Sequence, residues 1–147
     1  MTAVLLRPAR PDDTAALVDV WRRAVEATHD FLTPDDVAEL EAGVRDEYLA
    51  AVDVTVAERD GRVAGFVGTV GHRVEMLFVD PDLHGQGVGR ALLAHVARDH
   101  PVLELDVNEQ NPAALGFYRA QGFEVTGRSA TDDEGRPFPL LHLRRES

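Results

Sequence analysis

The feature that most constrains the fold of this 147-residue chain is a glycine-rich turn between an apolar strand and a helix. Residues 74–79 are apolar except for Glu75, a pattern typical of a central strand that is covered on both faces. The turn at residues 85–89 has glycine at every second position and leads into an apolar helix. Glycines let the backbone approach a ligand closely, and free N–H groups at a helix start bind anions. The segment predicts a site for phosphate oxygens, although a tight turn that only packs the helix is the alternative.

The rest of the chain alternates between helical and strand-like patterns. Apolar residues recur every three or four positions in two early segments, which begin at Asp12-Asp13 and at Thr33-Pro34. Asp60-Gly61 marks a hairpin turn between two alternating strands. The predicted strands are residues 4–7, 52–56, 63–70, 74–79, 102–107, 123–130 and 138–143, with later helices after residue 89 and over 112–121. This order predicts an α/β domain in which a central mixed β-sheet is flanked by helices.

The composition excludes several classes of function. The chain has no cysteine, and all 15 basic residues are arginine, so thiol chemistry, a P-loop and a Schiff-base lysine are ruled out. A formal charge of −11 argues against nucleic-acid binding and favours a cationic small partner. No apolar run is long enough to cross a membrane, and no His and acidic residues have metal-ligand spacing, so we expect no metal. The apolar patch at residues 4–6 is too short for a signal peptide, so we expect a cytoplasmic protein.

The glycine turn does not match a dinucleotide-binding fingerprint. The third glycine of that fingerprint would fall at position 90, which is Arg90 here. The chain also reaches the turn through a β-hairpin instead of a βαβ unit. Both differences argue against a nucleotide cofactor of this type.

The turn instead resembles the acetyl-CoA loop of the GNAT N-acetyltransferases. That family's pattern, Q/R-x-x-G-x-G/A, maps onto His84, Gly87 and Gly89, and residues 111–123 resemble its second signature, N-x-x-A-x-x-F-Y-x-x-x-G-F. The motifs occur in the family's order, separated by one helix and one strand. The resemblance implies one GNAT domain over residues 1–147. It also implies an enzyme in which a primary amine attacks acetyl-CoA directly within a ternary complex, since no cysteine can carry the acetyl group.

The resemblance also implies which residues hold acetyl-CoA. Main-chain groups on the central strand bind the pantetheine, and main-chain N–H groups of the turn bind the pyrophosphate. His84 stands where the family has Arg or Gln, so we expect weaker binding that improves as the pH falls, if this side chain contacts the pyrophosphate. The expected contacts are Leu77, Val79, His84, Gly85, Gln86, Gly87, Val88, Gly89, Arg90, Asn111 and Tyr118. Asn111 also has a simpler interpretation as the N-cap of the following helix.

Three residues are candidates for the acid–base chemistry. Tyr118 matches the family tyrosine that protonates the CoA thiolate, although a tyrosine in an apolar helix stripe is otherwise a core residue. Glu75 is a candidate base, because a carboxylate in an apolar strand needs a partner or a task. By the two-residue period of a strand it should share a face with Leu77, while a salt bridge to arginine is the alternative. Asp106 on the neighbouring strand, or a water molecule, could instead serve as base.

The acceptor is expected to be a small cationic amine or a peptide amine. The resemblance places the loop after the first helix beside the acceptor, so His29 and Phe31, with Glu75 and Asn108, are the expected substrate contacts. His72 and His142 are expected to be structural or exposed. Two other functions remain open: a CoA-binding sensor or partner module without catalysis, and an interaction domain that binds no CoA. The fold often forms homodimers through its last strands, which the sequence does not test.

Overall fold

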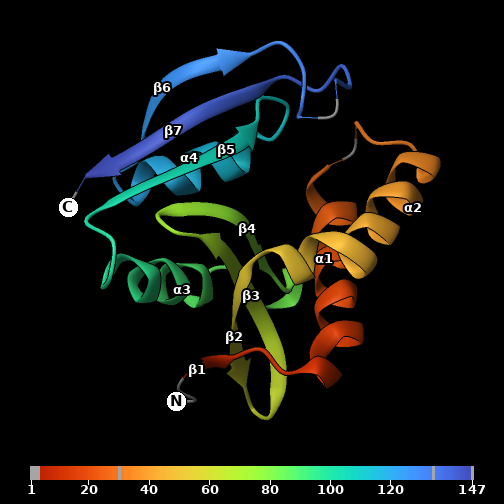
Figure 1. Cartoon of the computed structure of the whole chain (residues 1–147), viewed down its shortest axis with the longest axis vertical. Coiled ribbons are helices and arrows are strands. Elements are labelled where there is room, and N and C mark those ends of the chain that lie inside the picture. Colours follow the sequence, from red (N-terminus) through yellow and green to blue (C-terminus); the bar gives the residue numbers. More distant parts are fainter. Residues whose placement is uncertain (1–3, 30, 134, 147) are drawn as a thin grey trace.

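The computed structural model describes residues 4–29, 31–133 and 135–146, and in them seven strands form one mixed sheet (Figure 1). The strand order is β1-β2-β3-β4-β5-β7-β6, and all neighbours pair antiparallel except β4 with β5. The strands are β1 (Leu5–Pro8), β2 (Asp53–Arg59), β3 (Arg62–Val70), β4 (Arg73–Val79), β5 (Val102–Asn108), β6 (Glu124–Ser129) and β7 (Leu140–Glu146). The helices are α1 (Thr14–Thr28), α2 (Pro34–Gly43), α3 (Val88–Ala97) and α4 (Pro112–Ala120). The predicted mixed sheet with flanking helices is confirmed.

Helices cover both faces of the sheet, which gives two apolar cores. On one face α3 and α4 pack through Leu92, Leu93 and Tyr118, and on the other α1 packs through Leu17 and Trp21. The described residues contain no helix that is both long and apolar enough to cross a bilayer.

The helix predicted to begin at Thr33-Pro34 is interrupted. Its start is as expected: the Thr33 hydroxyl accepts a hydrogen bond from the Asp36 N–H at 3.1 Å, and the Asp36 carboxylate accepts one from the Thr33 N–H. The regular helix ends at Gly43, and a wider π-type turn covers Val44–Tyr48. A Cβ atom on Gly43 would lie 2.8 Å from the Tyr48 ring, so the missing side chain lets the ring fold back onto the helix.

A β-bulge in β4 decides which side chains reach which core. Thr69 of β3 pairs with Val74, while Gly68 pairs with Met76, so Glu75 is the extra residue. The bulge breaks the two-residue alternation on which the sequence-based placement of Glu75 depended. Met76 and Phe78 therefore pack towards α1, whereas Leu77 and Val79 pack towards α3 and α4.

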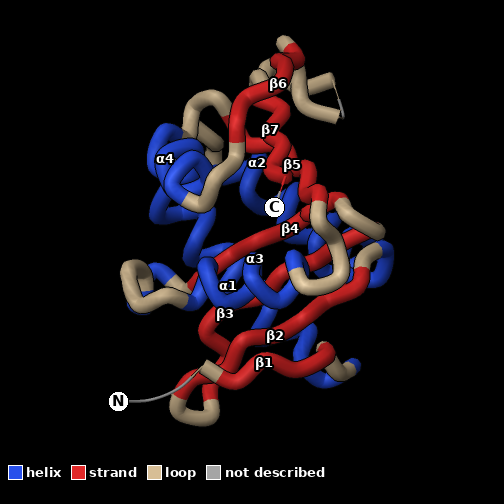
Figure 2. The backbone as a smooth tube through the Cα atoms, turned by 90° about the vertical axis from the view of Figure 1, so that its left-hand side faces the viewer, coloured by secondary structure: helices blue, strands red, loops and turns tan. Residues whose placement is uncertain are grey.

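The strands β4 and β5 separate almost at once. Their parallel ladder consists of Arg73 opposite Glu104 and Val74 opposite Leu105, and it does not continue along β4. Figure 2 shows the strands β1–β4 and the strands β5–β7 diverging as two groups. The remaining length of β4 therefore presents one edge to an opening between the two halves of the sheet.

Candidate active site

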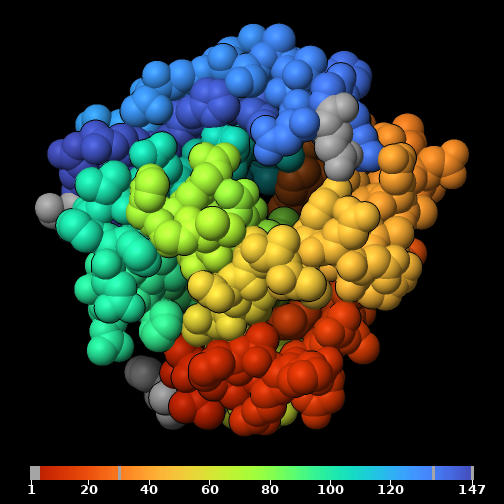
Figure 3. Space-filling model, in the orientation of Figure 1, coloured from red at the N-terminus to blue at the C-terminus, as the bar shows by residue number. Residues whose placement is uncertain are grey.

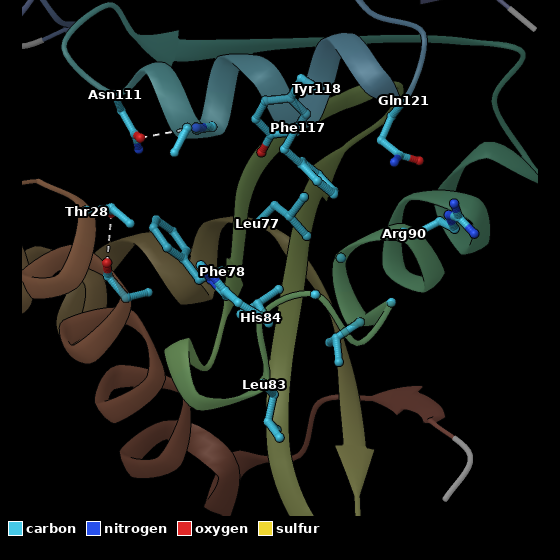
Figure 4. A pocket seen from close by; sticks show the side chains of 18 of the residues that line it. Thr28, Leu77, Phe78, Leu83, His84, Arg90, Asn111, Phe117, Tyr118 and Gln121 are labelled. Carbon is cyan, nitrogen blue, oxygen red and sulfur yellow. Dashed lines mark hydrogen bonds between the residues drawn. The ribbon is translucent and has the colours of Figure 1, made fainter. Parts of the chain in front are cut away.

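A cavity of about 500 Å³ lies between the end of α1, the free edge of β4, the glycine turn and α4 (Figure 4). Ten of the eleven residues expected to hold acetyl-CoA line it: Leu77, Val79, His84, Gly85, Gly87, Val88, Gly89, Arg90, Asn111 and Tyr118. Gln86 does not line it; its side-chain oxygen accepts a hydrogen bond from the Arg59 guanidinium instead. Segments that are far apart in the sequence therefore line one cavity together.

The glycine turn has the geometry of an anion cradle. Gly85 and Gly87 have φ angles of +77° and +85°, and no atom lies within 4 Å of where their Cβ atoms would be. Gly87 is the N-cap of α3 without a side-chain hydrogen bond, and the first N–H bonded back to it is that of Ala91, at 3.0 Å. The N–H groups of residues 88–90 therefore have no intrahelical acceptor. Together with the positive end of the helix dipole, they suit a pyrophosphate.

Gly89 meets a different requirement, close packing between α3 and α4. A Cβ atom there would lie 3.0 Å from the Phe117 ring, so a larger residue would push the two helices apart.

A buried carboxylate at the end of β4 fixes the position of the glycine turn. Asp80 follows β4, is 0% exposed, and receives two hydrogen bonds from Arg23 at 2.8 and 2.9 Å and one from Arg62 at 2.5 Å. It also accepts the N–H of Asp82 at 2.9 Å. Burial alone would raise the pKa of Asp80, but these donors together lower it to about 2. The carboxylate thereby ties α1 and β3 to the segment that enters the glycine turn.

The free edge of β4 offers main-chain groups to the cavity. The Asp80 N–H donates to Ala64 of β3 at 2.8 Å, and successive residues of a strand direct their N–H and C=O groups to opposite edges. By this alternation Leu77 and Val79 direct their N–H and C=O groups towards the opening between β4 and β5. The arrangement suits a chain of alternating amides such as pantetheine.

Tyr118 and Asn111 close the cavity on the side of α4. The Tyr118 hydroxyl points into it, and Asn111 accepts the Ala114 N–H at 3.2 Å as the N-cap of α4 (Figure 4). Burial raises the pKa of Tyr118, so its hydroxyl keeps its proton at neutral pH. The helix-cap interpretation of Asn111 is confirmed, and the residue also lines the cavity.

A second cavity, of about 530 Å³, opens on the other side of β4. In Figure 3 the surface is hollowed where the segment after α2, the β3–β4 hairpin and the chain before β7 meet. The expected substrate contacts His29, Phe31, Glu75 and Asn108 all line this cavity, as does Asp106. Among its described lining residues, only His29 and Phe78 also line the first cavity.

Arg73, which the sequence did not single out, organises the carboxylates of the second cavity. Its guanidinium donates to Glu75 at 2.9 Å and to Asp106 at 2.6 Å. The other Asp106 oxygen lies 2.6 Å from His142 Nδ1, and His142 Nε2 lies 2.7 Å from the Ser129 hydroxyl. Glu75 therefore has the arginine salt bridge considered as its alternative role, and His142 is a half-buried partner of Asp106. Glu75 and Leu77 line different cavities, so the expectation that they share a face was wrong.

Several other cavity residues that the sequence analysis missed are apolar or small. Phe78 separates the cavities, and Thr28 and Phe117 line the first one. In the sequence, a phenylalanine that lines a cavity looks the same as one that packs in the core, and only its neighbours in space tell the two apart. Around both cavities, as elsewhere in the described parts of the chain, no three His, Cys, Asp or Glu side chains cluster as a metal site would need.

Comparison with known proteins gives consistent matches. The profile of the acetyltransferase (GNAT) domain matches residues 50–125. Two proteins named peptidyl-lysine N-acetyltransferase YjaB are similar over nearly the whole chain: that of Salmonella typhimurium is 46% identical over 94% of this chain and 95% of its own, and that of Escherichia coli is 47% identical over 95% of each. The solution structure of apo-YjaB from Escherichia coli superposes with a TM-score of 0.90 at 43% identity, covering 97% of both chains.

Proposed function

This chain belongs to the GNAT family of acetyl-CoA-dependent N-acetyltransferases, and we propose that its acceptor is the side-chain amine of a lysine in a peptide or protein. In this proposal acetyl-CoA occupies the cavity beside the glycine turn. The acceptor enters through the second cavity, and the two meet beside Phe78 in the opening between β4 and β5.

The observation that carries the proposed acceptor is the lining of the second cavity. Most of its residues are apolar, among them Trp21, Leu40 and Met76, which suits the aliphatic stem of a lysine. Its described lining also contains four carboxylates against one arginine, which suits a cationic amine: Glu75, Asp106, Asp132 and Asp133 against Arg73. The names of the two YjaB relatives point to the same acceptor.

We assign the remaining roles in the same proposal. Main-chain groups of Leu77 and Val79 bind the pantetheine, the N–H groups of residues 88–90 bind the pyrophosphate, and His84 and Arg90 flank it. Tyr118 donates its hydroxyl proton to the leaving thiolate. Glu75 and Asp106, paired with Arg73, attract and orient the ammonium group of the acceptor.

The test compares acceptors in an acetyl-CoA assay that follows CoA thiol release and peptide mass. One peptide has blocked termini and a single lysine, a second carries arginine at that position, a third has a free N-terminus and no lysine, and a polyamine is the small-amine probe. The chain itself contains no lysine, so any acetyl-lysine detected comes from the peptide. We expect acetylation of the first peptide and not the second. A higher kcat/KM for the free N-terminus or the polyamine would refute the proposed acceptor.

A further inference from the structure

Amine acetylation by direct attack needs a group that removes a proton from the acceptor ammonium. Such a group must reach the place where donor and acceptor meet. His29 and Phe78 line both cavities within the described structure, and of these two only His29 can accept a proton. We propose that His29 is the general base of the reaction, an inference that rests on the proposed assignment of the two cavities.

The hydrogen bonds around Thr28 determine which nitrogen of His29 carries the proton. The Thr28 hydroxyl lies 2.8 Å from the Ala24 carbonyl, which can only accept, so the hydroxyl proton is directed there (Figure 4). The same oxygen lies 2.7 Å from His29 Nδ1 and therefore acts as acceptor in that contact. Nδ1 must carry a proton, which leaves the lone pair of the neutral imidazole on Nε2.

The position of His29 also suits the imidazolium that forms in the reaction. His29 is the C-cap of α1, and its N–H donates to the Val25 carbonyl at 2.7 Å. The negative end of the helix dipole at this position stabilises an imidazolium. The ring is held by Phe31, at 5.3 Å between centroids, and Phe31 contacts Phe138 at 5.5 Å, so the imidazole is supported across the acceptor cavity.

The two carboxylates considered from sequence fit this task less well. Glu75 and Asp106 line only the acceptor cavity, and both accept hydrogen bonds from Arg73. Both carboxylates are thus held on the acceptor side, and neither lines the first cavity. These residues keep the binding role proposed above.

The protons balance in the step as follows. His29 Nε2 takes one proton from the acceptor ammonium, and the amine nitrogen attacks the thioester carbonyl carbon. The C–N bond forms and the C–S bond breaks, while Tyr118 gives its proton to the thiolate sulfur. The excess proton on the new amide nitrogen returns to Tyr118. The products are the amide, CoA thiol and an imidazolium that releases its proton to solvent.

The test uses two variants of the full chain and a matched control. His29→Asn keeps a side-chain N–H for Thr28 but removes the base, and His29→Ala leaves room for added imidazole. His72→Asn is the control, because His72 lies in the exposed turn before β4 and pairs with Glu104. We expect His29→Asn to lower kcat on the lysine peptide about 100-fold or more, while CoA still raises its melting temperature as in the wild type. Imidazole should restore activity to His29→Ala, and His72→Asn should behave as the wild type.

A second acceptor separates a base from a merely structural residue. In a peptide whose lysine γ-methylene is replaced by sulfur, the amine is less basic. The loss of kcat caused by His29→Asn should therefore be smaller with this peptide than with the lysine peptide. Two results would overturn the assignment of His29 as the base. One is an equal loss of kcat in His29→Asn on both acceptors together with no rescue of His29→Ala by imidazole. The other is a kcat of His29→Asn close to that of the wild type. If the wild type prefers another amine, the proposed acceptor fails, and the same variants assayed with that amine still decide the role of His29.

Discussion

Replacing Asp80 with asparagine tests how the fold holds the glycine turn. The Asp80 carboxylate is 0% exposed and accepts charged hydrogen bonds from Arg23 and Arg62. Asparagine keeps the shape but removes the charge and turns one acceptor into a donor, which would face a guanidinium. The variant should therefore lose stability and, because the Asp82 N–H loses a charged acceptor, bind acetyl-CoA more weakly.

Two arguments give similar magnitudes for the loss of stability. Breaking a buried ion pair costs about 3–5 kcal/mol, but the Arg23 and Arg62 side chains are 35% and 56% exposed and can regain water, so we expect about 2–3 kcal/mol. The pKa of Asp80 falls from 3.8 to about 2, and at about 1.4 kcal/mol per pKa unit this corresponds to about 2–3 kcal/mol. In a domain of this size the melting temperature should fall by roughly 5–10 °C.

The measurement is urea unfolding followed through the fluorescence of Trp21, the single tryptophan, which is buried in the α1 core. Asp82→Asn is the control, because that side chain is 78% exposed and should change stability by less than about 0.5 kcal/mol. The pKa of Asp80 is depressed, so its contribution is complete above about pH 4 and is lost as the pH falls towards 2. The difference between wild type and Asp80→Asn should shrink over that window. Equal stability of the two proteins at pH 7 would refute the reasoning.

Three further predictions concern the first cavity, the proposed acetyl-CoA site. Tyr118→Phe should lower kcat about 100-fold while the Kd for acetyl-CoA is unchanged. If the variant instead loses acetyl-CoA binding, the role of Tyr118 is structural. If the variant keeps full activity, Tyr118 is not the acid. Gly87→Ala places a side chain at φ +85°, which should cost about 1 kcal/mol in unfolding experiments and raise the KM for acetyl-CoA. Gly61→Ala, at φ +78° in the β2–β3 hairpin, should cost a similar amount without changing that KM. In thermal unfolding, acetyl-CoA at about 100 times its Kd should stabilise the protein by about 2.7 kcal/mol, whereas ATP and NAD should not; no shift with CoA would contradict the assigned cavity.

Local sequence patterns were sufficient to predict most elements, and the family resemblance named residues that line the first cavity. The strand, glycine turn and helix around residues 74–97 are consecutive in the chain, and conformations such as those of Gly85 and Gly87 depend on local backbone freedom. The cap at Asn111 and the helix that follows are equally local. All residues named in the turn 84–90 except Gln86 line the first cavity, because a turn and the helix that it starts have little freedom to separate.

The residues that sequence analysis misplaced depend on distant parts of the chain. The bulge at Glu75 is a property of the pairing between β3 and β4, and one extra residue moves every later side chain of the strand to the other face. Asp80, which the sequence analysis did not single out, lies 57 positions from its partner Arg23, so no local pattern could indicate the pair.

The sequence by itself determined the mixed sheet, the glycine turn at the start of α3 and the place of Tyr118 in the helix that follows the Asn111 cap, because each follows from a local pattern or a continuous motif. Only the tertiary structure decided how the second cavity is built. The separation of β4 from β5 creates two cavities, Arg73 pairs with the candidate carboxylates, and His29 lies where the cavities meet. These relations join segments that are remote in sequence, and packing brings them together only when the whole core forms.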